Sequence, residues 1–123
     1  MATHLQQPKR SRTCGQHCVA MLAGVDPQAV ITKSKMSGGT SVERPLAIAK
    51  MFGLRAASQL WSVRDFEQLP SNAILKLRKA GSPAKRWHWA CVVDGVIHDP
   101  SCSVAGEIVK GYSIVAVMPM RKA

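Results

Sequence analysis

Hydrophobic residues follow helical spacing in the first half of the chain and strand-like runs in the second half. Apolar side chains recur every three or four positions in three segments, which predicts helices over 14–22, 27–31 and 41–52. Gly24 and Gly53 are typical of helix ends, whereas Asp26 followed by Pro27 is typical of a helix start. Apolar runs separated by Gly, Pro and Ser then predict strands over 54–60, 73–77, 87–93, 95–99 and 113–118. This order predicts an α+β fold, with N-terminal helices packed on a C-terminal antiparallel β-sheet.

The composition indicates a globular chain that needs no crosslinks. Hydrophobic residues make up 46% of the 123 positions, which predicts one domain over 1–123 with its own core and a basic, irregular lead-in over 1–12. No apolar run approaches the roughly 20 residues that span a membrane, and no signal-type segment follows Met1. We therefore expect no membrane association, and a protein that is cytoplasmic or exported without a cleavable signal peptide. Its four cysteines are then expected to be free thiols.

A cysteine, a histidine and an aspartate occur in an order that suits thiol catalysis. Cys14 stands at the start of the first predicted helix, where the positive end of the helix dipole lowers the pKa of a thiol. His88 begins a predicted strand, and Asp99 ends the next strand after a turn at Asp94 and Gly95. This hairpin places His88 and Asp99 on neighbouring strands, where the carboxylate can fix the tautomer and orientation of the imidazole. The three residues are candidates for nucleophile, base and orienting acid.

Several segments resemble papain-like cysteine peptidases, most closely the branch that processes bacteriocins at double-glycine leaders. Residues 13–22, TCGQHCVAML, resemble the nucleophile helix of that branch, and residues 39–54 resemble its turn and second helix. The histidine strand and the Asp-Pro pair of the branch match His88 and Asp99 followed by Pro100. The resemblance covers residues ~7 to ~101, and the order and spacing of the motifs are more specific than any one of them.

This resemblance implies a papain-like fold in which the nucleophile, general base and orienting acid are Cys14, His88 and Asp99. It also implies a glutamine that supplies a side-chain amide to the oxyanion. In the family this glutamine sits six positions before the cysteine, where the present chain has Pro8. Gln7 lies one residue earlier and Gln6 two, so Gln7, or else Gln6, is the candidate oxyanion residue.

The implied reaction is attack of a thiolate on a peptide or other amide bond, through a thioester acyl-enzyme and without a cofactor. Peptide hydrolysis is the leading expectation, with a peptide or protein as substrate; deamidation, transamidation and isopeptide cleavage share the same chemistry. Cys18, one turn after Cys14, is expected in the core, and His17 is the second-ranked base. His98 is expected at the surface because it alternates to the face opposite Asp99.

Zinc binding is an alternative use of the cysteines and histidines. Cys14 and Cys18 are separated by three residues, but ten residues separate Cys91 from Cys102. Structural zinc sites usually have two closely spaced ligand pairs, and the second pair is missing here. The sequence therefore does not predict a metal site.

The basic charge of the chain favours an anionic partner. Seventeen basic residues against seven acidic ones give a formal net charge of +10. A nucleic-acid-binding or protein-interaction module without catalysis is thus the alternative function, with basic clusters at Lys9, Arg10 and Arg12 and at Lys76, Arg78, Lys79, Lys85 and Arg86. Two Phe and one Tyr make an aromatic stacking platform hard to build, so nucleic acid is the less favoured partner. We instead expect an acidic substrate or an acidic inhibitor, as for a toxin or effector paired with an immunity protein.

Overall fold

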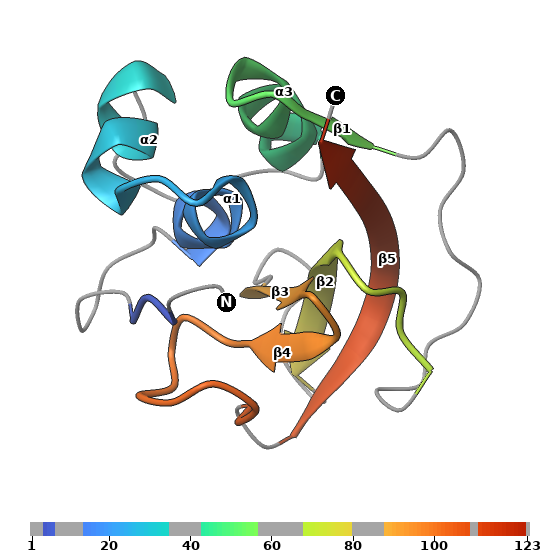
Figure 1. Cartoon of the computed structure of the whole chain (residues 1–123). Helices are drawn as coiled ribbons and strands as arrows, with labels where there is room; N and C mark the ends of the chain where they lie inside the picture. Colours follow the sequence, from blue (N-terminus) through green and yellow to red (C-terminus); the bar gives the residue numbers. More distant parts are fainter. Residues whose placement is uncertain are drawn as a thin grey trace.

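The computed structural model describes residues 4–6, 14–34, 43–56, 68–79, 88–108 and 111–122 of the chain. The helices within this part are α1 (Cys14–Ala23), α2 (Pro27–Ser34) and α3 (Glu43–Met51). The strands are β1 (Leu54–Ala56), β2 (Ala73–Lys79), β3 (His88–Val93), β4 (Val96–His98) and β5 (Tyr112–Lys122). Figure 1 shows the helices gathered on one side of the molecule, with β2, β3 and β4 on the other. The predicted α+β class is therefore confirmed.

The strands form an antiparallel sheet in the order β1-β5-β2-β3-β4. β2 lies between β5 and β3, and its register places Leu77 opposite His88 and Lys79 opposite Tyr112. Directly opposite residues of an antiparallel pair project from the same face of the sheet. The end of β2 therefore lies beside the start of β3 and the start of β5.

β5 is longer than the strand that the sequence predicts over 113–118, because the strand continues through Pro119 to pair with β1. The backbone N–H of Met120 donates to the carbonyl of Asn72, on the β2 side. The nitrogen of Pro119 therefore points to the other side, beyond Ala56, where β1 ends. Pro119 therefore removes no hydrogen bond between β5 and β2, which is why this inner strand tolerates a proline.

The predicted helix boundaries between α1 and α3 agree with the structure. Gly24 and Gly53 have φ angles of 71° and 79°, in the left-handed region that ends helices. The carboxylate of Asp26 caps α2 by accepting a 2.7 Å hydrogen bond from the backbone N–H of Gln28. The predicted third helix started at Ser41, which lies outside the described residues, as does the 57–60 part of the predicted strand 54–60.

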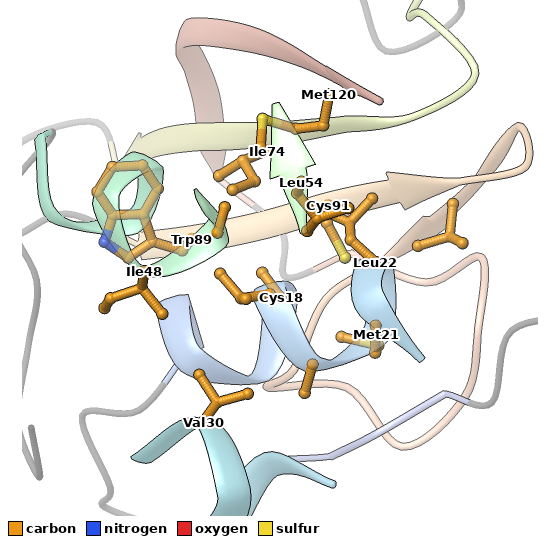
Figure 2. Close-up of a cluster of buried hydrophobic side chains, with 14 of the residues drawn as sticks. Cys18, Met21, Leu22, Val30, Ile48, Leu54, Ile74, Trp89, Cys91 and Met120 are labelled. Carbon is orange, nitrogen blue, oxygen red and sulfur yellow. The ribbon is translucent and has the colours of Figure 1, made fainter. Parts of the chain in front are cut away.

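The main core lies between the helices and one face of the sheet. α1 is buried around its whole circumference, and its first nine residues are all buried. It packs against β3, α2 and α3. Figure 2 shows side chains of this core, which include Cys18 on α1 and Trp89 and Cys91 on β3. The opposite face of the sheet carries a second apolar cluster, formed by Ala73, Leu75, Leu77, Ala90, Val92, Ile114 and Val117.

Candidate active site

Cys14 is the first residue of α1, and its side chain lies at the end of the helix where backbone N–H groups have no partner within the helix. The residue is 8% exposed. Because α1 packs directly against β3, its N-terminal end is held beside the sheet. Cys14 thus combines partial access with a position at the positive end of a helix dipole.

A tight hairpin joins β3 to β4 and carries the second and third candidate residues. Asp94 and Gly95 form its turn with φ angles of 50° and 83°, as a two-residue hairpin turn with both φ angles positive requires. The register pairs Cys91 with His98, so Asp99 follows directly after the last paired residue of β4. The turn predicted at Asp94 and Gly95 is therefore present, and it returns the chain toward His88.

His88 and Asp99 meet in the structure. Nε2 of His88 lies 2.5 Å from Oδ1 of Asp99, and the two residues are 8% and 0% exposed. The same carboxylate oxygen accepts a 2.9 Å hydrogen bond from the backbone N–H of Ser101. The carbonyl of Asp99 accepts a further bond from the N–H of Cys102. Oδ1 of Asp99 is therefore held by two partners, and the loop that follows β4 helps to set the orientation of the carboxylate.

Cys14 completes the cluster through a hydrogen bond with His88. Because Nε2 of His88 is engaged by Asp99, Nδ1 is the ring nitrogen that can donate to the sulfur. Burial lowers the pKa of His88, but the hydrogen bonds with Asp99 and Cys14 and the negative charges of these groups raise it to about 9. The imidazole is therefore protonated at neutral pH, and it carries its positive charge beside the Cys14 sulfur.

Tyr112 is a neighbour of the cluster that was not predicted from the sequence. Its ring centroid lies 5.2 Å from that of His88, with an interplanar angle of 48°. Tyr112 begins β5 and reaches His88 across β2, whose Leu77 pairs with His88. The signal in the sequence is weak, because only the strand order brings the start of β5 to the start of β3.

The other cysteines lie in different environments. Burial, followed by a hydrogen bond with Cys91, raises the pKa of Cys18 well above its ordinary value. Both residues are fully buried, and Figure 2 shows them within the core. The prediction that Cys18 belongs to the core is confirmed. Burial and the nearby charge of Asp99 also raise the pKa of Cys102. Cys18 and Cys102 are therefore poor thiolates and Cys91 is fully buried, which leaves Cys14 as the candidate nucleophile.

The prediction that His98 lies at the surface is wrong. His98 is 3% exposed, because it faces the helix side of the sheet with Cys91 and is covered by His4. The two imidazoles stack with centroids 5.2 Å apart, and their Nδ1 atoms lie 3.0 Å apart. Nε2 of His4 donates to the carbonyl of Cys102, at 2.7 Å. The second-ranked base, His17, is buried within α1.

The predicted oxyanion residues are placed only in part. Gln7 lies outside the described residues, and Gln6 is exposed. Leu5, the residue before Gln6, is tied to α1 because its backbone N–H donates to the sulfur of Met21. This contact holds the 4–6 segment against the helix that begins with Cys14. The choice between Gln7 and Gln6 stays a prediction.

The structure supports only part of the predicted basic clusters. Lys76 is 6% exposed, which contradicts its place in a surface cluster. It lies in the middle of β2, with Trp89 and Ala116 opposite it on the two neighbouring strands, and burial lowers its pKa. Arg78 and Lys79 at the end of β2 are exposed. The remaining members, Lys9, Arg10, Arg12, Lys85 and Arg86, lie outside the described residues.

Across the described parts of the chain, no three or more His, Cys, Asp or Glu side chains are grouped so that they could hold a metal ion. No helix in the same parts has the length and apolar character needed to cross a membrane.

Comparisons of the chain with protein-family models, with curated proteins and with solved structures gave no match.

Proposed function

We propose that the protein is a papain-like cysteine hydrolase that cleaves peptide or other amide bonds, with Cys14 as nucleophile, His88 as general acid and base, and Asp99 as orienting residue. One observation carries this proposal. The imidazole of His88 interacts with both Asp99 and Cys14 by hydrogen bonding and by charge, and these interactions raise the pKa of His88 to about 9. An imidazolium held between a carboxylate and a cysteine at a helix start is the arrangement that thiol acyl transfer requires.

The proposed reaction has two halves. The Cys14 thiolate attacks the carbonyl carbon of the substrate, and the His88 imidazolium then gives its proton to the departing amine as the carbon–nitrogen bond breaks. The product of this half is a thioester on Cys14 and a neutral His88. A water molecule attacks the thioester, His88 removes its proton, and the acid product leaves as the thiolate and imidazolium are restored.

The oxyanion of each tetrahedral intermediate needs hydrogen-bond donors. The backbone N–H of Cys14 has no partner within α1 because it belongs to the first turn, and it is the first donor that we assign. Gln7, or Gln6, supplies the second from its side-chain amide. Replacing each by Ala separately identifies the donor, since loss of one oxyanion donor lowers kcat by about 10²–10³. If both variants keep the kcat of the wild type, no glutamine serves the oxyanion and this part of the proposal is wrong.

Selective alkylation tests the proposal without knowledge of the substrate. We expect iodoacetamide at about pH 6 to modify Cys14 before Cys18, Cys91 or Cys102, because Cys14 lies at a helix start beside the His88 imidazolium, Cys18 and Cys91 are fully buried, and the pKa of Cys102 is raised. Intact mass and peptide mapping locate the modified residue. The His88→Ala variant should lose this selectivity, whereas His17→Ala should keep it. If Cys14 reacts no faster than the other three cysteines, the proposed function is wrong.

A further inference from the structure

Two exposed cations lie at the end of the sheet that carries His88. Arg78 and Lys79 are the last residues of β2, and both side chains are exposed. Leu77, which precedes them, pairs with His88, while Lys79 pairs with Tyr112. Tyr112 in turn contacts the His88 ring. The end of β2 therefore forms the border of the candidate active site.

The side chain of Lys79 is held on the same face as His88. Alternation along β2 places Lys79 on the face of Leu77, and hence on the face of both His88 and Tyr112. Its stem lies over Gly111, where an added methyl group would be 3.8 Å from Cε of Lys79 and 4.0 Å from Cγ. This contact directs the lysine stem along the start of β5, beside Tyr112.

The side chain of Arg78 extends to the other face of the sheet. It alternates with Lys79 and shares the face of Ile74, which belongs to the core beneath the helices. This is the face on which α1, the helix that begins with Cys14, packs against β3. The two cations therefore lie on opposite faces of the sheet, at the end of β2 that borders His88.

Neither cation is neutralised within the part of the chain that the structure describes. The ion pair found there joins His88 and Asp99, so the carboxylate nearest to the site is already engaged. Strand spacing and rise place the Cα atom of Lys79 about 8 Å from that of His88. In water, a unit charge about 8 Å away changes the local concentration of a monovalent anion about twofold at low salt.

We propose that Lys79 forms a subsite that binds a carboxylate of the substrate next to the bond that is cleaved, and that Arg78, on the other face of the sheet, adds to the positive potential there. The inference rests on the proposed function and deepens it, because it assigns an acidic peptide as the preferred substrate. The carboxylate belongs to an Asp or Glu side chain or to a chain terminus, and both sources share the charge-assisted hydrogen bonds that Arg and Lys donate.

The first test compares an anionic with a neutral alkylating agent of similar size. The ratio of the rate constants of Cys14 for iodoacetate and iodoacetamide reports the electrostatic potential at the sulfur. In the variant with Arg78→Gln and Lys79→Gln we expect this ratio to fall about fourfold at low salt, as two charges each contribute about twofold. High salt should bring the wild-type ratio down toward that of the variant.

Lys50 offers a matched control. It is exposed in the last turn of α3, away from the paired ends of β2, β3 and β5, and Lys50→Gln removes one charge as Lys79→Gln does. We expect Lys79→Gln to lower the ratio and Lys50→Gln to leave it unchanged. Equal falls in these two variants mean that net charge alone acts, which overturns the subsite. An unchanged ratio in the double variant also overturns the subsite but leaves a reactive Cys14 and the proposed function intact. An unreactive Cys14 overturns both.

The second test identifies the source of the carboxylate. Libraries of peptides with blocked ends, one with Glu and one with Gln at each varied position, are compared with a library of neutral peptides that have a free carboxyl terminus. We expect about tenfold higher kcat/KM for one of the two anionic libraries, and loss of this preference in the double variant. Equal kcat/KM for all three libraries, or an anionic preference that survives in the double variant, overturns the assignment of an acidic peptide. Inhibition by added oligonucleotides without any preference for an anionic peptide library also overturns it.

Discussion

Replacing Asp99 by Asn removes the charge that keeps His88 protonated. Nε2 of His88 lies 2.5 Å from Oδ1 of Asp99, which is fully buried. Burial by itself lowers the pKa of His88, yet the contacts with Asp99 and Cys14 raise it from 6.5 to about 9. One pKa unit corresponds to about 1.4 kcal/mol, so burial and these contacts together give a net preference for the imidazolium of about 3 kcal/mol.

We expect the pKa of His88 to fall by about 2 units in Asp99→Asn, because the amide keeps an acceptor oxygen but loses the negative charge. The measurement is an NMR titration of the His88 ring protons between pH 5 and pH 10. Asp94→Asn is the matched control, since Asp94 is exposed in the hairpin turn with a φ of 50°, which Asn adopts readily. An unchanged His88 midpoint in Asp99→Asn, or an equal fall in the control, would refute the reasoning.

The same shift makes the stability of the fold depend on pH. The folded-state pKa of His88 is raised, so its stabilising contribution is complete below the unfolded value near 6.5 and is lost as pH rises through about 9. Urea titrations of the wild type should therefore show the free energy of unfolding declining by up to about 3 kcal/mol across this window. In Asp99→Asn the decline should be much smaller. A decline of the same size in both proteins would assign it to another group.

Three other substitutions test separate parts of the structure. Burial and the charge of His4 lower the pKa of His98, so the wild type should lose stability as pH falls below about 6.5, and His98→Gln should flatten this loss in denaturant titrations. Gly95→Ala should cost about 1 kcal/mol in thermal unfolding because its φ is 83°, and an unchanged Tm would contradict the assigned turn. Trp89→Ala should cost about 3–5 kcal/mol, since Trp89 is 1% exposed in the main core, and a loss below 1 kcal/mol would contradict that packing.

The hairpin that carries His88 and Asp99 was predictable because its determinants are local. Asp94 and Gly95 adopt the positive φ angles that a two-residue turn needs, and apolar runs on both sides define the paired strands. Once the turn is fixed, pairing determines that the ends of the two strands return to each other. Helix ends at glycine and the cap at Asp26 were predictable for the same reason.

The contacts that the sequence did not predict depend on strand order and on distant segments. His98 is buried because His4, 94 residues away along the chain, stacks on it. Lys76 is buried because β2 is an inner strand, whereas its charge favours the surface when the segment is considered alone. Tyr112 reaches His88 only because β5 and β3 flank the same strand. None of these arrangements follows from spacing within one segment.

The contact between Cys18 and Cys91 accounts for the placement of Cys14 beside His88. Cys18 lies one helical turn beyond Cys14, about 6 Å along α1, and Cys91 lies three residues beyond His88, about 10 Å along β3. Both thiols are fully buried and hydrogen-bonded to each other. Because a helix and a strand are rigid over such distances, fixing the buried pair also limits how far the ends of α1 and β3 can move apart. The inert cysteines of the core therefore help to position the cysteine and histidine that we propose to be reactive.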